Sequence, residues 1–173
     1  MTHPGQRVQI DVKHVPAACI VGDAEGEKFY QYTAIDEFSR FRYVEAFREI
    51  STYSSMVFLE HMLKAFPFPV ECVQTDNGFE FTKRFGSSKS DKDLTLFEKK
   101  LAKLGIEHKK IRPFTPRHNG KVERSHRKDN EYFYATHRFY SFEDFSKQLK
   151  IHNKKYNNWR DAKPPVAAWG AMN

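Results

Sequence analysis

The sequence predicts a single α/β domain in which helices cover a mixed β-sheet. Its 173 residues are 39% hydrophobic and 15% aromatic, with 16 Phe and 8 Tyr, so one core of ordinary size is available. Apolar residues alternate in some segments and recur at helical spacing in others, which gives the element order βββαβαβαα. No internal repeat and no interior linker interrupts this order, and the composition argues against wholesale disorder.

Three strands are predicted at the start of the chain. Residues 7–13 (RVQIDVK) alternate between polar and apolar side chains, and Asp11 stands mid-strand, where aspartate is disfavoured. Residues 28–36 and 41–47 are two further β-rich runs. The four residues between them, 37–40, predict that these two strands form a hairpin.

A helix and a fourth strand are predicted next. Ser51 is a suitable N-cap for the apolar residues that recur at helical spacing between 56 and 66, and Pro67 and Pro69 end the helix. Residues 70–75 (VECVQT) predict a short strand. This strand leads directly into the turn sequence Asp-Asn-Gly.

The next segment predicts another helix and strand. Apolar residues recur at helical spacing between 94 and 104, and Gly105 ends that helix. Residues 106–111 predict the fifth strand. Pro113 and Pro116 then exclude regular structure in the connection that follows.

Two helices are predicted at the end of the chain. The first begins near Lys121, just after an Asn-Gly pair. The second is predicted from Ser141, which forms a capping-box pattern with Asp144, and from an apolar stripe after it. The pair Pro164-Pro165 is expected to end this last helix.

Neither secretion nor membrane insertion is predicted. The longest uninterrupted apolar run, 15–21, is far shorter than the roughly 18 residues of a spanning helix, and the N-terminus has no signal-peptide pattern. We therefore expect a soluble, intracellular protein. Cys19 and Cys72 have the spacing of neither a disulfide framework nor a zinc finger, so both are expected to be buried thiols.

Positive charge is concentrated in one segment. The chain has 29 Lys plus Arg and 22 Asp plus Glu, a net charge of +7, yet residues 108–128 alone hold eight basic residues and one acid, Glu123. The rest of the chain is therefore neutral. Such a run is often only a solvated face, but a neutral body with one basic stripe is also typical of a nucleic-acid binder, which is the interpretation we favour.

Three acidic residues occupy unusual positions. Asp11 lies inside a predicted strand, Asp76 lies at the end of another, and Glu123 is the sole acid of a basic helix. Each has an ordinary explanation, such as an exposed strand face, a turn or a pair of charges along a helix. Together, however, carboxylates from three elements are the ligands that a divalent cation needs, and a basic surround suits a phosphodiester substrate.

Two motifs carry a family resemblance. Residues 75–81 read TDNGFEF and residues 113–124 read PFTPRHNGKVER. This pair resembles the DDE integrase catalytic core. The resemblance extends to Asp11 in IDVKHVP, to AIDEFSR at 34–40 and to YNNWR at 156–160, so it covers nearly the whole chain. It is closer to bacterial insertion-sequence transposases than to retroviral integrases.

The resemblance implies a ribonuclease H-like fold, a five-stranded mixed sheet flanked by helices. Asp11 matches the first acid of the family triad, Asp76 the second and Glu123 the third. The 46 residues between the last two are more than the family usually has, and the excess is expected in Lys83–Asp93. Residues 1–173 would then be a catalytic core without the family's N-terminal and C-terminal DNA-binding domains.

The implied activity is metal-dependent cleavage of DNA followed by strand transfer. Two Mg²⁺ ions, replaceable by Mn²⁺, would lie about 3.5–4 Å apart. Asp11 would bridge both ions, and Asp76 and Glu123 would each complete one. No nucleophilic side chain and no organic cofactor are needed. The implied partners are the DNA ends of a mobile element, target DNA and further copies of the chain, in the bacterial cytoplasm at the nucleoid.

Four residues are assigned to DNA binding. Lys121, Arg124 and Lys128 recur at i, i+3 and i+7 on one face of the predicted helix, which suits phosphate contacts more than base readout. Asn119, just before the helix, is placed in the same set. The alternative is that these side chains are ordinary solvated groups.

Neighbouring polar residues receive structural interpretations. Asp36 begins the hairpin connection and Glu80 follows the turn between two Phe, so hydrogen bonding or surface exposure explains both. His118 is most simply solvent-exposed, because a metal-activated nucleophile needs no histidine base.

Two other functions remain open: a ribonuclease H-like nuclease that only hydrolyses, and a DNA-binding remnant without catalysis. The nuclease does not explain the P-x-x-P-x-x-N-G-x-x-E-R segment, and the remnant is disfavoured because no acid of the triad is replaced.

Overall fold

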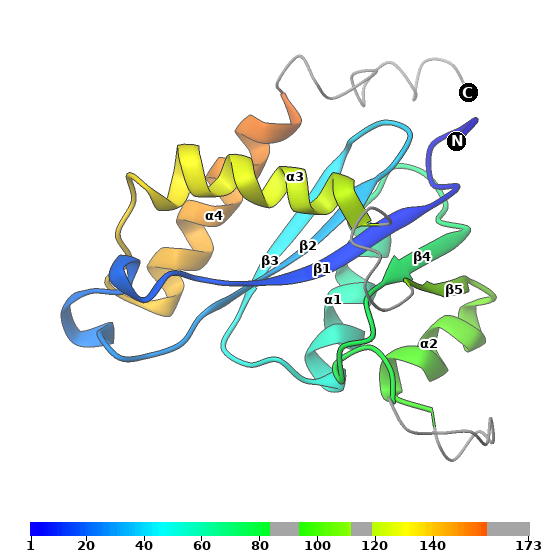
Figure 1. Ribbon diagram of the computed structural model, residues 1–173, viewed down its shortest axis with the longest axis horizontal. Helices are drawn as coiled ribbons and strands as arrows, with labels where there is room; N and C mark the ends of the chain where they lie inside the picture. The colour runs from blue at the N-terminus through cyan, green and yellow to red at the C-terminus, as the bar shows by residue number, and fades with distance from the viewer. Residues whose placement is uncertain (84–93, 112–118, 159–173) are drawn as a thin grey trace.

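Five strands form one mixed sheet in the computed structural model, which describes residues 1–83, 94–111 and 119–158. Their order across the sheet is β3-β2-β1-β4-β5 (Figure 1). Antiparallel pairing joins β1 to β2 and β2 to β3, whereas β4 lies parallel to β1 and β5 parallel to β4. The predicted strands and hairpin are confirmed. The strands are β1 (Val8–His14), β2 (Tyr30–Asp36), β3 (Arg42–Phe47), β4 (Cys72–Thr75) and β5 (Glu107–Lys110).

Helices lie on both faces of this sheet (Figure 1). Helices α1 and α2 cover one face, and α3 and α4 lie on the other. A π-helical turn, η5, continues α3, and two short 3₁₀ turns follow β1. The helices are α1 (Thr52–Ala65), α2 (Leu96–Leu104), α3 (Gly120–Asp129) and α4 (Phe142–Asn157), and the short turns are η1 (Ala17–Cys19), η2 (Gly22–Ala24) and η5 (Asn130–Tyr134).

Side-chain caps set where three of these helices begin. The Ser51 hydroxyl accepts a hydrogen bond from the Ser54 N–H, which confirms the predicted cap of α1. The start of α2 differs from the prediction, because Thr95 and Glu98 form a reciprocal capping box and α2 therefore begins at Leu96. Helix α2 ends at Leu104 and is followed by Gly105, as predicted.

The predicted capping box of α4 forms only in part. The Ser141 hydroxyl accepts from the Asp144 N–H as expected. The Asp144 carboxylate, however, accepts from the Tyr140 N–H, one residue before the N-cap, so the reciprocal bond is displaced. Helix α4 ends at Asn157. The predictions for 84–93, for prolines 113 and 116 and for Pro164-Pro165 lie outside the described residues.

Apolar side chains form two clusters, one on each face of the sheet. Alternation along β1 turns Val8 and Ile10, both fully buried, toward α1 and α2. The second cluster packs α4 and η5 against β3 and the segment before β2, with the Phe29 and Phe145 rings stacked 5.6 Å apart. Hydrophobic burial therefore places α1, α2 and α4 on the sheet.

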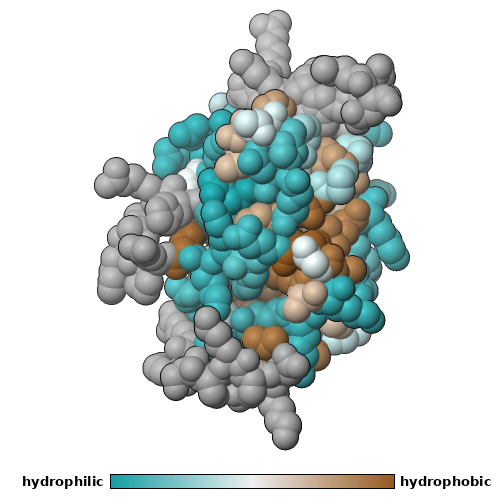
Figure 2. Space-filling model, turned by 90° about the vertical axis from the view of Figure 1, so that its right-hand side faces the viewer, coloured by the Kyte–Doolittle hydropathy of each residue, from teal (hydrophilic) through white to brown (hydrophobic). Residues whose placement is uncertain are grey.

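The surface and the cysteines agree with the sequence analysis. Hydrophilic residues cover much of the face shown in Figure 2, and hydrophobic residues occupy a smaller area beside them. Cys19 and Cys72 are buried and free, as predicted. Among the described helices, none combines the length and the apolar character that a bilayer crossing requires.

A fully buried ion pair joins α3 to β3. Arg42 Nη1 lies 2.9 Å from Asp129 Oδ2, and neither side chain is exposed to solvent. His152 and Asn153 of α4 bond to the same pair, at 2.7 Å from Asp129 and 2.8 Å from Arg42. Burial alone would raise the pKa of Asp129, but the Arg42 charge and the hydrogen bonds from His152 and Gln31 hold this pKa well below its usual range.

Removing one partner of this pair should make the protein less stable to unfolding. Arg42→Met leaves the Asp129 carboxylate buried without its counter-charge, which should lower the free energy of unfolding by about 3–5 kcal/mol. The matched control is Arg48→Met, because Arg48 forms an exposed pair with Glu143. This variant should lose less than about 1 kcal/mol of unfolding free energy. Urea unfolding measures both, and equal losses would show that the buried pair does not hold α3.

Candidate active site

The polar face of β1 carries the first acid of the candidate site. Because Val8 and Ile10 point toward α1 and α2, Gln9 and Asp11 point to the opposite face, where α3 lies. The Asp11 side chain is 23% exposed, so it is largely removed from water but still open to solvent. This explains an aspartate in mid-strand, which strand propensity disfavours.

The second acid lies beside the first at the end of β4. In the parallel register, Val8 is opposite Val73 and Gln9 is opposite Gln74. Two residues further along each strand, this register brings Asp76 next to Asp11. The Asp76 carboxylate also accepts the Gly78 N–H at 2.8 Å, which fixes the turn after β4.

The third acid, Glu123, lies in the first turn of α3 and is exposed. A negative charge is favourable at this end of a helix. The three acids that the sequence singled out therefore come from a strand, the end of a second strand and a helix.

Electrostatics shows that these acids act on one another. Burial, together with the charges of Asp76, Glu123 and Glu80, raises the pKa of Asp11 to about 7. Asp11 therefore carries the combined repulsion of three carboxylates. We call Asp11, Asp76, Glu123 and Glu80 the acid cluster.

Glu80 belongs to this cluster, although sequence reasoning gave it a structural role. Its side chain is 8% exposed, and its carboxylate lies so close to Gly78 that a Cβ added there would be 2.5 Å from Glu80 Oε2. Any side chain at residue 78 would therefore require the Glu80 carboxylate to move. The sequence signal that could have pointed to Glu80 is its position, two residues after the Asn-Gly turn that follows Asp76.

The donor set fits a divalent cation in its chemistry. Carboxylate oxygens are the ligands that Mg²⁺ and Mn²⁺ prefer, and a cation would relieve the repulsion that raises the pKa of Asp11. Within 1–83, 94–111 and 119–158, no group of three His, Cys, Asp or Glu side chains lies close enough to hold one ion. The fold thus brings the acids near one another against their repulsion, without closed coordination geometry among the described residues.

His126 lies next to Asp11 without forming a charged pair at neutral pH. Its Nδ1 is 3.9 Å from Asp11 Oδ2, and its Nε2 is 2.9 Å from the Thr33 hydroxyl. Burial lowers the pKa of His126 to about 4, so the ring is neutral near pH 7. This histidine therefore does not cancel the negative charge of the cluster.

Gln9 caps α3 from the neighbouring strand. Its Oε1 accepts the N–H groups of Lys121 and Val122, both at 3.1 Å, which are two donors that the first turn of a helix leaves unpaired. Its Nε2 donates to the Glu37 carboxylate, which also accepts from Arg7. A single side chain of β1 therefore holds the start of the helix that bears Glu123.

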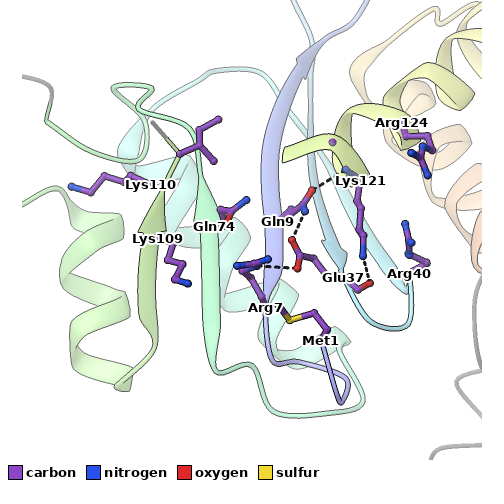
Figure 3. A pocket seen from close by; sticks show the side chains of 12 residues that line it. Met1, Arg7, Gln9, Glu37, Arg40, Gln74, Lys109, Lys110, Lys121 and Arg124 are labelled. Carbon is purple, nitrogen blue, oxygen red and sulfur yellow. Dashed lines mark hydrogen bonds and ion pairs between the residues drawn. The ribbon is translucent and has the colours of Figure 1, made fainter. Parts of the chain in front are cut away.

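The predicted DNA-binding residues occupy different environments. Asn119 is the N-cap residue of α3, but its side chain makes no capping bond, is only 2% exposed and lies 3.4 Å from the Ile10 carbonyl. Lys121 and Arg124 line an open pocket beside β1, where Lys121 Nζ donates to the Glu37 carbonyl at 2.7 Å (Figure 3). Lys128 is half-buried and does not line this pocket.

Comparison with known protein families shows which family the chain belongs to. A family model described as an integrase core domain matches residues 1–116, and a second model with the same description matches residues 104–161. The chain belongs to the integrase core domain family. The resemblance found in the sequence, to a DDE integrase-type core, is thereby confirmed.

Solved structures agree with this integrase core assignment at the level of the fold. The catalytic core domain of BIV integrase matches with a TM-score of 0.64 and 17% identity, over 97% of this chain and 98% of that chain. A chain of the simian T-cell lymphotropic virus intasome, solved with PP2A regulatory subunit B56 gamma, matches with a TM-score of 0.60 and 20% identity, over 84% of this chain. This integrase core spans 47% of that intasome chain. No curated protein matches the sequence.

The fold prediction is confirmed by these matches. A five-stranded mixed sheet with flanking helices is the ribonuclease H-like fold of integrase cores. The predicted closeness to bacterial insertion-sequence transposases stays a prediction, as do the roles of the site residues.

The Gln9 cap can be tested by hydrogen exchange. Gln9→Leu should leave the Lys121 and Val122 N–H groups without an acceptor, which costs roughly 1–3 kcal/mol and frays the first turn of α3. Exchange at these two amides should accelerate, while amides of the β2–β3 hairpin keep their protection. Gln148→Leu on α4 is the matched control. Unchanged exchange at both amides would show that Gln9 does not hold the helix.

The raised pKa of Asp11 predicts a pH-dependent stability. The folded protein keeps the Asp11 proton up to about pH 7, whereas the unfolded chain releases it near pH 4, so stability without metal falls as pH rises between these values. Asp11→Asn should remove this loss and make the protein roughly 1–3 kcal/mol more stable at pH 8. The difference should vanish near pH 4. Thermal unfolding in EDTA at several pH values measures it, and a destabilised variant at pH 8 would contradict it.

Proposed function

We propose that this integrase core cuts DNA strands and joins them to target DNA by metal-dependent phosphoryl transfer. One observation carries the proposal: Asp76 and Glu80 after β4 and Glu123 on α3 act electrostatically on Asp11, two residues along β1 from Gln9, which lines a basic pocket. Carboxylates gathered against their own repulsion are typical of a cation site. Cations next to them suit a polyanionic substrate.

Asp11, Asp76 and Glu123 are the residues that would hold Mg²⁺, or Mn²⁺ in its place. When bound, such ions supply an activated water or 3′-hydroxyl and stabilise the leaving oxygen of the phosphodiester. The protein itself contributes rigid placement of the carboxylates on β1, after β4 and on α3. No covalent intermediate with a side chain is part of this proposal.

Asp11 must lose its proton before it can act as a ligand. With its pKa raised to about 7, Asp11 is only partly ionised near neutral pH in the absence of metal. Binding of a cation therefore releases a proton from this residue, and affinity for the metal rises with pH. The same coupling makes the activity increase between about pH 6 and pH 8.

Lys121 and Arg124 are proposed to bind phosphates of the DNA backbone. Both residues line the pocket beside the acid cluster. Lys128 lies further along α3 and is proposed as an additional phosphate contact outside this pocket. Asn119 is left out of the DNA-binding set because its side chain is buried against β1. We also propose that the partners are DNA and further copies of the chain, with residues 1–173 acting as the catalytic core.

Substitution of Asp76 should separate chemistry from binding. Asp76→Asn keeps the shape of the side chain but removes the charge that holds a cation, so cutting and joining should fall at least about 100-fold, whereas affinity for DNA should persist. The assay uses labelled linear and branched DNA with Mg²⁺ or Mn²⁺. Asp23→Asn, an exposed acid on η2, is the matched control.

Each outcome of this assay distinguishes between functions. Wild-type activity in the Asp76→Asn variant would exclude Asp76 as an essential ligand. Cutting without joining by the wild-type protein would favour a hydrolytic nuclease. Binding without any cutting would favour a DNA-binding remnant.

A further inference from the structure

A large open pocket lies beside the acid cluster on the α3 face of the sheet. Its volume is about 980 Å³, and its walls come from β1, β4, β5, the β2–β3 turn and the start of α3 (Figure 3). The cations along these walls come from the residue before β1, the β2–β3 turn, β5 and the start of α3. They are Arg7, Arg40, Lys109, Lys110, Lys121 and Arg124, and we call this site the basic pocket.

The acid content of the basic pocket is low and internally compensated. Among the described residues that line it, Glu37 is the sole acid. Glu37 is 5% exposed and accepts from Arg7 Nε at 2.9 Å, as well as from Gln9. The Glu37 charge therefore offsets Arg7 at the floor of the pocket. Lys110 pairs with Glu98 of α2 at 3.7 Å. The remaining cations, Arg40, Lys109, Lys121 and Arg124, give the cavity a positive potential.

Arg40 occupies its position against the preference of its backbone. It lies in the β2–β3 turn with φ of 68°, in the left-handed region that Gly and Asn adopt more easily. The pKa of Lys121 is lowered by burial and then by the Arg40 charge, which places both cations in one electrostatic environment. The left-handed turn does not itself favour an arginine at this position, and the Arg40 side chain lines the basic pocket.

The basic pocket leads toward the acid cluster along β1, since Gln9 lines the pocket and Asp11 lies two residues further on. Arg7, Gln9 and Asp11 alternate onto the same face of the strand, so the floor of the pocket leads directly to the first acid. Arg7 and Asp11 are four positions apart along extended chain, which is about 13 Å. A chain of phosphates that lies in the pocket would thus reach the acids without leaving the surface.

We propose that the basic pocket binds the sugar–phosphate backbone of a DNA strand that leads into the acid cluster, with Arg40 and Lys109 as phosphate contacts additional to Lys121 and Arg124. This inference rests on the proposed function, because it assigns a path to the substrate of that reaction. The cations come from the residue before β1, the β2–β3 turn, β5 and α3, so they suit an extended polyanion rather than one compact anion. They contact phosphates and carry no base specificity.

A charge-removal experiment tests the path. The test variant combines Arg40→Asn, which suits the left-handed turn, with Lys109→Ala on the exposed side of β5. The matched control combines Lys64→Ala on α1 with Lys99→Ala on α2, which removes the same net charge from the opposite face of the sheet. Affinity for a labelled DNA duplex is measured by fluorescence anisotropy at several salt concentrations.

The test variant should bind DNA roughly 10- to 100-fold more weakly at low salt, and the slope of log affinity against log salt should fall by about one to two units. The control should lose little affinity and keep its slope. The melting temperature of the test variant should be equal to or higher than that of the wild type, because Asn fits the turn at residue 40. A purely structural role of Arg40 would instead lower this temperature.

The outcomes separate the pocket from the proposed function. If test and control variants lose equal affinity, or if the wild type does not bind DNA, the DNA path is overturned. If the two variants lose equal affinity but the wild type cuts DNA with metal and Asp76→Asn does not, the proposed function still stands and only the DNA path fails. Inorganic tripolyphosphate serves as a competitor. If it displaces DNA at a concentration lower than that of the DNA phosphate groups, the pocket is a site for a compact anion and the strand path is overturned.

Discussion

Buried polar contacts at both ends of α3 determine where the candidate site is built. The helix has one buried apolar side chain, Val122, so hydrophobic packing alone does not orient it. Gln9 holds its first turn, and the Arg42–Asp129 pair holds its last. Buried hydrogen bonds are costly to leave unmade, and they therefore fix position more sharply than apolar contact does. The distance between Glu123 and the strand that bears Asp11 depends on these two anchors.

The same arrangement explains why opposite charges gather next to each other on one face of the sheet. Helices α1, α2 and α4 bury apolar clusters, whereas the region between α3 and β5 has a polar floor that begins with Gln9 and Gln74. Carboxylates collect around Asp11, and cations collect around Arg7 and Lys121. A DNA substrate needs both kinds of charge. Cations bind its phosphate backbone, and carboxylates hold the metal that its reaction requires.

The strands and the helices could be predicted from the sequence, because each leaves a local signal. Alternation predicted β1 and the Ser51 cap predicted α1, whereas the roles of Asp11, Asp76 and Glu123 stay a prediction. The contacts that fix α3 were not predictable, since Gln9 lies 112 and 113 residues before the amides it caps. The buried environment of Asn119 and the part of Glu80 in the acid cluster also follow from tertiary packing. Helix α2 began later than apolar spacing indicated, because the Thr95 cap overrides that spacing.

The central claim is that Asp11, Asp76 and Glu123 form one divalent-cation site. Crystals of the protein soaked in Mn²⁺ test it most directly, because anomalous scattering locates the ion without assumptions about catalysis. The account predicts an anomalous peak within coordination distance of the Asp11 and Asp76 carboxylates, with Glu123 turned toward it. A peak elsewhere, or a Mn²⁺-saturated crystal in which Asp11 and Asp76 hold no ion, would contradict the account.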